Sequence, residues 1–314
     1  GRLVMLAGEP GIGKTRTCRE LSAHATMRGA LVLSGRCHAE QGAPPYWPWV
    51  QVIRSYIGGH SPEQIRSRMG ARAADIAEVV PEVKECLPGL EPPPALEPEG
   101  ARFRLFDSIA TFLKRASEAQ PLVLVLDNLH WADKSSLSFL EFLAQEMAQS
   151  QLLLLGTYRD VELTRRHPLA QTLGELAREP LFRRVLLRGL SEGEVGQFIE
   201  NASGSTLPGN LVRVVHTQTE GNPLFLTEVM RWLLQEGELT SGQLLADQSW
   251  SIRVPAGVKE VIGRRLDRLS EGCNQVLSLA SVVGREFALR LLERLTEGSS
   301  GDDLLEAVEE ALAA

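Results

Sequence analysis

The feature that most constrains this chain is a loop near its start, Gly8-Glu9-Pro10-Gly11-Ile12-Gly13-Lys14-Thr15. It matches the pattern G-x-x-x-x-G-K-S/T, with an apolar run before it and a helical pattern after it. Its glycines allow a tight turn whose N–H groups face an anion, at the positive end of the following helix. We therefore predict a P-loop that binds ATP, with Lys14 on the β- and γ-phosphates and the Thr15 hydroxyl on Mg²⁺.

Five short apolar runs predict buried parallel strands, because they are nearly continuous rather than alternating. They are Leu3–Ala7, Ala30–Ser34, Leu122–Leu126, Leu152–Gly156 and Arg184–Leu187. Helical patterns lie between them, which predicts an α/β fold with a five-stranded parallel sheet flanked by helices. We place this nucleotide-binding domain at residues 1–190. Residues 39–100 are expected to form an insertion between the second and third strands, because prolines cluster at both of its ends.

The pattern changes after residue 190, where the strands largely stop. Ser191 with Glu194 is a helix-start signature, and helical patterns continue to about residue 236. A polar stretch, Gly237–Trp250, follows, and apolar residues at helical spacing resume after Val254. We predict a helical domain at 191–250 and a small helical or winged-helix-like domain at 251–314. Since the first residues already read as a core strand, we expect the chain to be a piece of a longer protein.

The third apolar run ends in an acid, Asp127. Open parallel sheets bind ligands at the carboxyl ends of their strands, so Asp127 is expected beside Thr15, where it would hold Mg²⁺ directly or through water. The next residue is Asn128, and an amide cannot accept a proton as a carboxylate does. We therefore predict slow ATP hydrolysis, with Asn128 positioning water, or hydrolysis assisted by another group. Asp133 is a possible substitute, but we favour it as the cap of the next helix.

The fourth apolar run also ends in polar residues, among them Thr157 and Arg159. Its end is expected beside the phosphate loop, where either side chain could detect the γ-phosphate. The planar guanidinium of Arg159 suits phosphate oxygens. The alternative, that Arg159 pairs with Asp160 or another nearby acid, has equal weight on chemistry alone.

Composition excludes several classes of function. The net charge of −7 argues against nucleic-acid binding by this piece of chain. The four cysteines have no C-x-x-C spacing, so no zinc or redox motif is indicated. No apolar run reaches about 18 residues and no signal peptide is present, so we expect a cytoplasmic protein without a membrane span.

The combined motifs resemble the STAND branch of AAA-like ATPases, and more narrowly the ATPase module of large LuxR-type (MalT-like) transcription regulators. The same module is found fused to adenylate/guanylate cyclase or kinase domains. The resemblance rests on the phosphate loop, Leu122–Asp133, Gly156–Arg159, Pro44–Trp49 and Gly221-Asn222-Pro223. It implies that the helical domain is a lid, that Pro223 contacts the adenine and that Arg159 is the sensor. It also implies an ADP-bound resting state that ATP, after an inducer acts, converts to a self-associating one.

Two departures from the family pattern limit what carries over. Asn128 stands where the family usually has a second acid, and an upstream Val-Gly-Arg-Glu segment that helps to bind the nucleotide is absent. The expected nucleotide-binding set is Gly8, Glu9, Pro10, Gly11, Ile12, Gly13, Lys14, Thr15, Arg16 and Pro223, with Lys14, Asp127, Asn128 and Arg159 in catalysis.

Sequence alone leaves three functions open. The first is an ATP-binding, slowly hydrolysing signalling switch, and it agrees best with Asn128 and the Gly221-Asn222-Pro223 motif. The second is a motor-type AAA⁺ ATPase with continuous turnover. The third is a small-molecule phosphotransferase, for which no separate substrate base stands out.

Overall fold

A computed structural model of the chain describes residues 1–39, 44–164, 166–204, 208–235, 263, 266–267, 269–283, 289–295 and 301–313. The expected polar stretch at 237–250 and the start of the domain expected at 251 lie outside these residues. The described part divides into two units. The first contains residues 1–8 and 13–187, and the second contains residues 9–12 and 188–314.

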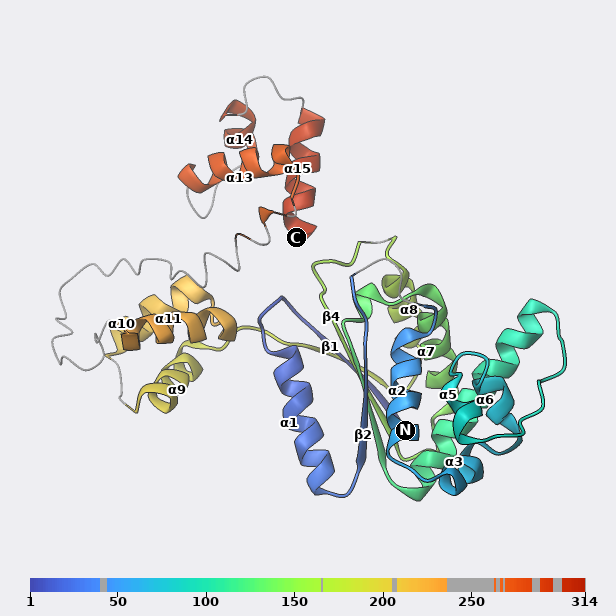
Figure 1. The fold of residues 1–314 in the computed structure, drawn as a ribbon. Helices are drawn as coiled ribbons and strands as arrows, with labels where there is room; N and C mark the ends of the chain where they lie inside the picture. The colour runs from blue at the N-terminus through green and yellow to red at the C-terminus, as the bar shows by residue number, and fades with distance from the viewer. Residues whose placement is uncertain are drawn as a thin grey trace. The chain divides into compact units, whose positions relative to one another are not determined.

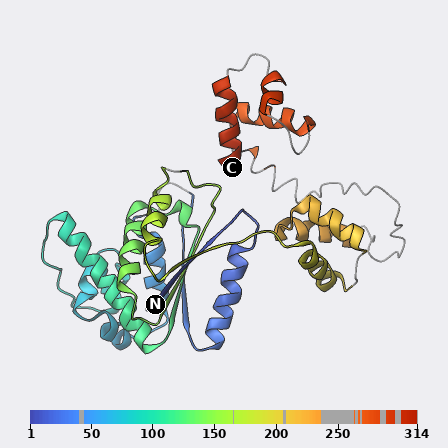
Figure 2. The same cartoon turned by 180° about the vertical axis from the view of Figure 1, so that it is seen from behind.

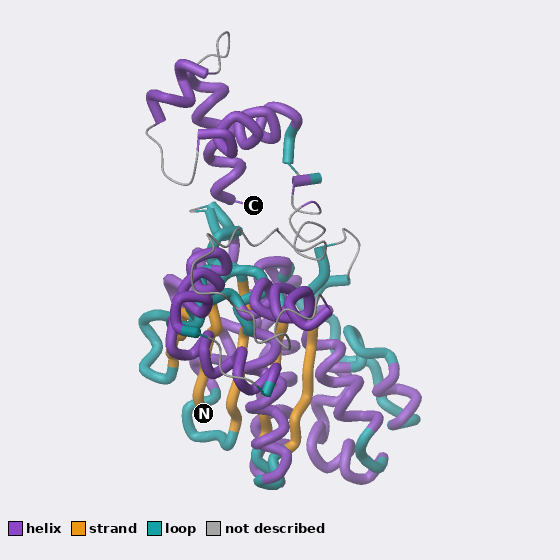
Figure 3. The backbone as a smooth tube through the Cα atoms, turned by 90° about the vertical axis from the view of Figure 1, so that its left-hand side faces the viewer, coloured by secondary structure: helices purple, strands orange, loops and turns teal. Residues whose placement is uncertain are grey.

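The first unit is built on a five-stranded sheet in which every pairing is parallel, in the order β2-β3-β4-β1-β5. The strands are β1 (Arg2–Ala7), β2 (Leu31–Arg36), β3 (Leu122–Asp127), β4 (Leu152–Tyr158) and β5 (Phe182–Leu186). They lie side by side in the tube view (Figure 3). The α/β fold with five parallel strands is therefore confirmed, although β4 continues two residues beyond the predicted Gly156 and includes Thr157. The prediction that the fifth strand is buried is wrong, because β5 pairs only with β1 at the end of the sheet order and most of its residues are exposed.

Helices cover the two faces of the sheet unequally (Figures 1 and 2). One face carries α1 (Lys14–Met27), whose Cys18 packs with Val123 and Val125 of β3. The opposite face carries a larger cluster that includes Leu124 and Leu126. The helices on this larger side are α2 (Trp47–Gly58), α3 (Pro62–Met69), α4 (Ala73–Ile76), α5 (Glu82–Cys86), α6 (Pro98–Ala119), α7 (Lys134–Glu146) and α8 (Pro168–Leu176), with short 3₁₀ turns at Gly70–Arg72 and Leu129–Trp131.

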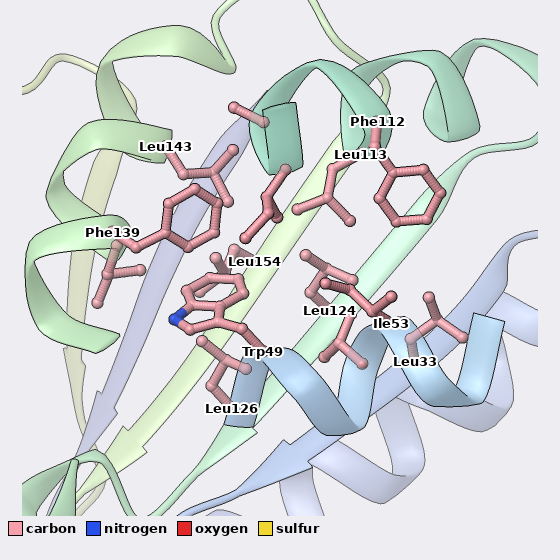
Figure 4. Packing of buried hydrophobic residues seen from close by; sticks show 14 of the residues in the cluster. Leu33, Trp49, Ile53, Phe112, Leu113, Leu124, Leu126, Phe139, Leu143 and Leu154 are labelled. Atoms are coloured by element: carbon pink, nitrogen blue, oxygen red, sulfur yellow. The ribbon is translucent and has the colours of Figure 1, made fainter. Parts of the chain in front are cut away.

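Most of the stretch 39–100 belongs to this main core. Trp49 of α2 is 1% exposed, lies edge-on to Phe139 with ring centroids 4.7 Å apart, and donates from Nε1 to the Ser136 carbonyl at 3.1 Å. Figure 4 shows Trp49 and Ile53 against the strand residues. The α2 backbone comes so close to β2 that a Cβ on Gly35 would meet the Pro48 carbonyl oxygen at 2.1 Å. Residues 47–58 therefore fix the β2 edge of the sheet.

The second unit is helical after residue 188. Helices α9 (Glu192–Ser203), α10 (Gly209–Thr219) and α11 (Pro223–Gln235) share a small core around Val195, Val215 and Leu226. The predicted helix start at Ser191 is confirmed, because Ser191 and Glu194 form a reciprocal capping box. Helices α13 (Glu271–Val283), α14 (Leu289–Leu295) and α15 (Gly301–Ala313) follow. No helix among the described residues is long and apolar enough to cross a membrane.

Candidate nucleotide-binding site

The phosphate loop joins β1 to α1 in a conformation that its glycines allow. Gly8, Gly11 and Gly13 have φ angles of 145°, 83° and 106°, in the region that residues with a Cβ rarely adopt. Helix α1 begins at Lys14 with no side-chain cap and no acid in its first turn. A helix usually recruits acidic side chains to its positive end, so their absence leaves this end suited to a bound anion.

Lys14 lies within this loop and is 8% exposed. Its Nζ donates to the Gly8 carbonyl at 2.6 Å, so the ammonium is held against the phosphate loop. Burial, together with the nearby Arg159 guanidinium, lowers the pKa of Lys14, while Asp160 and Asp127 act in the opposite direction. An arriving phosphate would stabilise the ammonium form, because opposite charges favour ionisation.

Asp127 ends β3 and is engaged on both carboxylate oxygens. Thr157, at the end of the neighbouring β4, donates to Oδ1 at 2.5 Å, and Nε of Arg36 lies 3.8 Å from Oδ2. Asp127 and Thr15 line the same cavity of about 370 Å³, beneath which Cys18 is buried. Burial and Asp127 raise the pKa of Cys18 to about 11, so the thiol stays protonated. The prediction that Asp127 lies beside Thr15 agrees with this cavity.

These donors fit Mg²⁺. A carboxylate and a hydroxyl are hard oxygen ligands, and magnesium usually takes one or two carboxylates together with phosphate oxygens and water. The described residues contain no group of three or more His, Cys, Asp or Glu side chains placed for a metal. Thr15 and Asp127 could therefore hold Mg²⁺ together with a nucleotide, without a complete protein cage.

Asn128 lies at the turn that follows β3. Its φ of 61° is in the left-handed region, where Asn and Asp are the best-tolerated residues with a Cβ. Its backbone N–H donates to Thr157 Oγ1 at 3.0 Å. The Thr157 hydroxyl, which is fully buried, therefore accepts from Asn128 and donates to Asp127, and so connects the two residues.

Arg159 follows β4 and lies in a cluster of side chains. Its Nη1 is 2.5 Å from Oε1 of Glu162, and its guanidinium carbon lies 5.3 Å from the ring centroid of Trp131. The register that pairs Tyr158 with Ala7 brings Arg159 to the phosphate-loop end of β1. Arg159 thus pairs with a nearby acid, which is one of the two alternatives given above, and that acid is Glu162 rather than Asp160.

His130 belongs to the same cluster of side chains and is 3% exposed. Its Nδ1 accepts from the Arg159 backbone N–H at 3.4 Å, and its Nε2 is 3.4 Å from Glu162 Oε2. Burial, with Arg159 and Lys14, lowers the pKa of His130 to about 3, so the ring is neutral near pH 7. The interpretation of Asp133 as a cap is confirmed, because its side chain accepts from Ser136 N–H at 2.9 Å.

The Gly221-Asn222-Pro223 motif belongs to the second unit, which also contains Glu9–Ile12. Asn222 Nδ2 donates to the Pro10 carbonyl at 3.1 Å, and its Oδ1 accepts from Leu224 N–H at 3.1 Å. Gly221 has a φ of 70°, and a Cβ there would meet the Leu190 carbonyl oxygen at 2.0 Å. Each residue thus has a local reason for its identity, and Pro223 supplies the first residue of α11.

Comparison with known proteins agrees with this geometry. Residues 1–155 match the family model of the AAA ATPase domain. This match covers β1 to β3 and the first four residues of β4, with the phosphate loop, Asp127 and most of the helices that cover the larger face of the sheet. The AAA ATPase match and the parallel sheet with its P-loop together identify the fold as that of P-loop NTPases.

Other relatives are more distant. An uncharacterized protein of Rhizobium meliloti (strain 1021) is 23% identical over 94% of this chain, and the chain spans 28% of that relative's length. Among solved structures, a STAND protein with a tetratricopeptide repeat sensor from Pyrococcus horikoshii is 15% identical, with a TM-score of 0.44 over 98% of this chain and 36% of its own. A Walker-type ATPase of Pyrococcus abyssi is 16% identical, with a TM-score of 0.45 over 98% of this chain and 84% of its own.

The sequence patterns did not identify three further residues near the candidate site. Arg36 lies near Asp127, and Glu162 pairs with Arg159. Gln51 of α2 holds the backbone of Arg36, accepting at 3.1 Å and donating at 2.9 Å. The rule that strand ends carry the site would have identified Arg36 had β2 been extended beyond Ser34. No comparable signal marks Glu162.

Proposed function

We propose that this chain is an ATP-binding, slowly hydrolysing switch module, off with ADP and on with ATP, within a multidomain regulator such as a transcription regulator or a cyclase. One arrangement carries the proposal: Lys14, Thr15 and Asp127 gather at one sheet edge, while the residue after Asp127 is Asn128. The first three residues suit binding of Mg·ATP. The fourth lacks the carboxylate that fast hydrolysis requires.

In this proposal the loop N–H groups and Lys14 bind the phosphates, and Thr15 and Asp127 hold Mg²⁺, which would neutralise charge on the phosphate oxygens. Arg159 detects the γ-phosphate, and Asn128 orients water without accepting its proton. Pro223 contacts the adenine, with residues 191–250 as a lid and 251–314 as a winged-helix-like domain. Arg16, exposed and paired with Glu20 at 2.7 Å, completes the loop's contacts at the start of α1.

The partners follow from the same proposal. An inducer of unknown chemistry would promote exchange of ADP for ATP, and the ATP state would self-associate in the cytoplasm. The net charge of −7 gives no reason to assign nucleic-acid binding to this part of the protein.

The experiment that tests the proposal is to denature the purified chain and identify the nucleotide that it releases. We expect ADP at close to one equivalent per chain, because a switch that hydrolyses once and exchanges slowly keeps its product. An empty chain that turns over added ATP continuously would contradict the switch and favour the motor-type ATPase. An empty chain that fails to bind added Mg·ATP would contradict nucleotide binding itself.

A further inference from the structure

The side chain of Glu162 is placed to control Arg159. Nη1 of Arg159 and Oε1 of Glu162 are 2.5 Å apart, and both side chains are about a quarter exposed (24% and 23%). The indole of Trp131 supports the guanidinium at 5.3 Å from its ring centroid. The contacts of the Arg159 guanidinium are thus a carboxylate and an aromatic ring.

We propose that Glu162 is a positioning residue that holds Arg159 when no γ-phosphate is bound and releases it when ATP is bound. The proposal rests on the function proposed above and extends it to the regulation of the same site. It assigns to Glu162 a role in distinguishing ATP from ADP, although Glu162 itself would not touch the nucleotide.

The physical basis is competition for one guanidinium. A carboxylate and a terminal phosphate both offer paired oxygens that fit the fork of Arg159. ADP brings no γ-phosphate, so Arg159 keeps Glu162 as its partner. ATP brings a more highly charged acceptor to the end of β1, beside which the β4 register places Arg159. A ligand shifts such an equilibrium only by its difference in affinity for the two states, and the γ-phosphate supplies that difference.

Glu162 also lies close to His130. Its second oxygen, Oε2, lies 3.4 Å from Nε2 of His130, and that ring is anchored through Nδ1 to the Arg159 backbone. The Glu162 carboxylate therefore has one neighbour in the segment after β3, His130, and one in the segment after β4, Arg159.

The test is the ratio of ATP to ADP affinity in Glu162→Gln, measured on the 314-residue chain with Mg²⁺ by competition against a fluorescent nucleotide. The variant weakens the hold on Arg159, so we expect the ratio to rise about fivefold, the size of one partly screened ion pair. The matched control is Glu175→Gln, which breaks the Glu175–Arg178 pair, a contact of 2.8 Å with the same three-residue spacing in an exposed position. The control should leave the ratio unchanged.

A purely structural role for Glu162 is separated by repeating the change in an Arg159→Ala background. If Glu162 acts through Arg159, the second substitution should move the ratio by less than about twofold there. An unchanged ratio in Glu162→Gln alone, or an equal rise with and without Arg159, would overturn the inference. If Lys14→Ala leaves ATP binding intact, the proposed function fails as well, whereas loss of binding in Lys14→Ala with an unchanged ratio in Glu162→Gln overturns only the role of Glu162.

Discussion

The phosphate loop and the ends of β3 and β4 lie at the carboxyl-terminal edge of the sheet, but they differ in how their polar groups are arranged. The loop has three glycines with positive φ and a helix start without a side-chain cap, so its backbone is arranged for an anion. Near the strand ends, by contrast, several polar side chains have protein partners. Thr157 donates to Asp127, Arg159 pairs with Glu162, and Asp133 caps α7.

In the proposed switch, this difference would separate nucleotide binding from the response to the γ-phosphate. Phosphates can enter the loop without breaking the contacts of Asp127 or Arg159, because the loop's donors are backbone groups and Lys14. A response to the γ-phosphate requires the strand ends to exchange existing partners. Such an exchange adds a barrier or a bias, which a switch can use and a rapid catalyst would avoid.

The largest effect is expected from Lys14→Ala, which tests the loop side of the comparison. Losing the buried ammonium should weaken Mg·ATP binding by about a hundredfold or more, since charge-assisted contacts to phosphate are among the strongest in proteins. Isothermal titration with ATP measures this. Lys84→Ala, which removes an exposed lysine of α5, is the control. Unchanged ATP affinity in Lys14→Ala would remove the loop from the site.

Asp127→Asn tests the strand ends. An amide keeps the acceptor for Thr157 but loses the charge that attracts Mg²⁺, so we expect the magnesium-dependent part of ATP affinity to fall about thirtyfold. The measurement is ATP affinity with Mg²⁺ and with EDTA. Asp133→Asn is a matched control, because asparagine caps a helix as well as aspartate does. Equal affinity with and without Mg²⁺ in the wild type and in Asp127→Asn would exclude Asp127 as a metal ligand.

The buried His130, close to the strand ends, should make the stability of the fold depend on pH. Burial lowers its pKa from 6.5 to about 3, so between these pH values the ring is protonated in the unfolded chain but neutral in the folded chain. The stabilisation is complete above pH 6.5 and is lost as the pH falls toward 3. Linkage predicts that the free energy of unfolding drops by about 2 kcal/mol between pH 7 and pH 5. Urea unfolding at both pH values measures it, and His130→Gln should reduce the drop, whereas His24→Gln, at an exposed histidine, should not.

The same comparison explains how far the sequence could predict the molecule. Apolar runs located all five strands, and the P-loop pattern located the phosphate site, because both depend on local composition and backbone conformation. The ends of the strands are harder to predict from apolar runs. The run that ends at Gly156 leaves out Thr157, which is polar yet fully buried. Its burial depends on Asp127 of the neighbouring strand, and no local pattern encodes that contact.

Glu162 shows the same limit more clearly. It lies three residues after Arg159, but in a segment without helical structure, where that spacing does not place side chains together. Only the fold brings it to Arg159 and His130. Helical spacing does mark Asp133 and Ser136, and for that reason the cap was correctly predicted.

The smallest change is expected from Asn128→Asp, which asks whether this single position makes the strand ends slow. Aspartate also tolerates the left-handed backbone at φ 61°, so the turn after β3 should persist. A carboxylate there can accept a proton from water. We expect single-turnover ATP hydrolysis to rise about tenfold, less than general-base catalysis usually contributes, because Thr157 still holds the neighbouring groups. Asn201→Asp, at an exposed position in α9, is the control. An unchanged rate would place water activation elsewhere, whereas a rise with unaltered nucleotide affinity would show that binding and turnover are set by separate residues of one sheet edge.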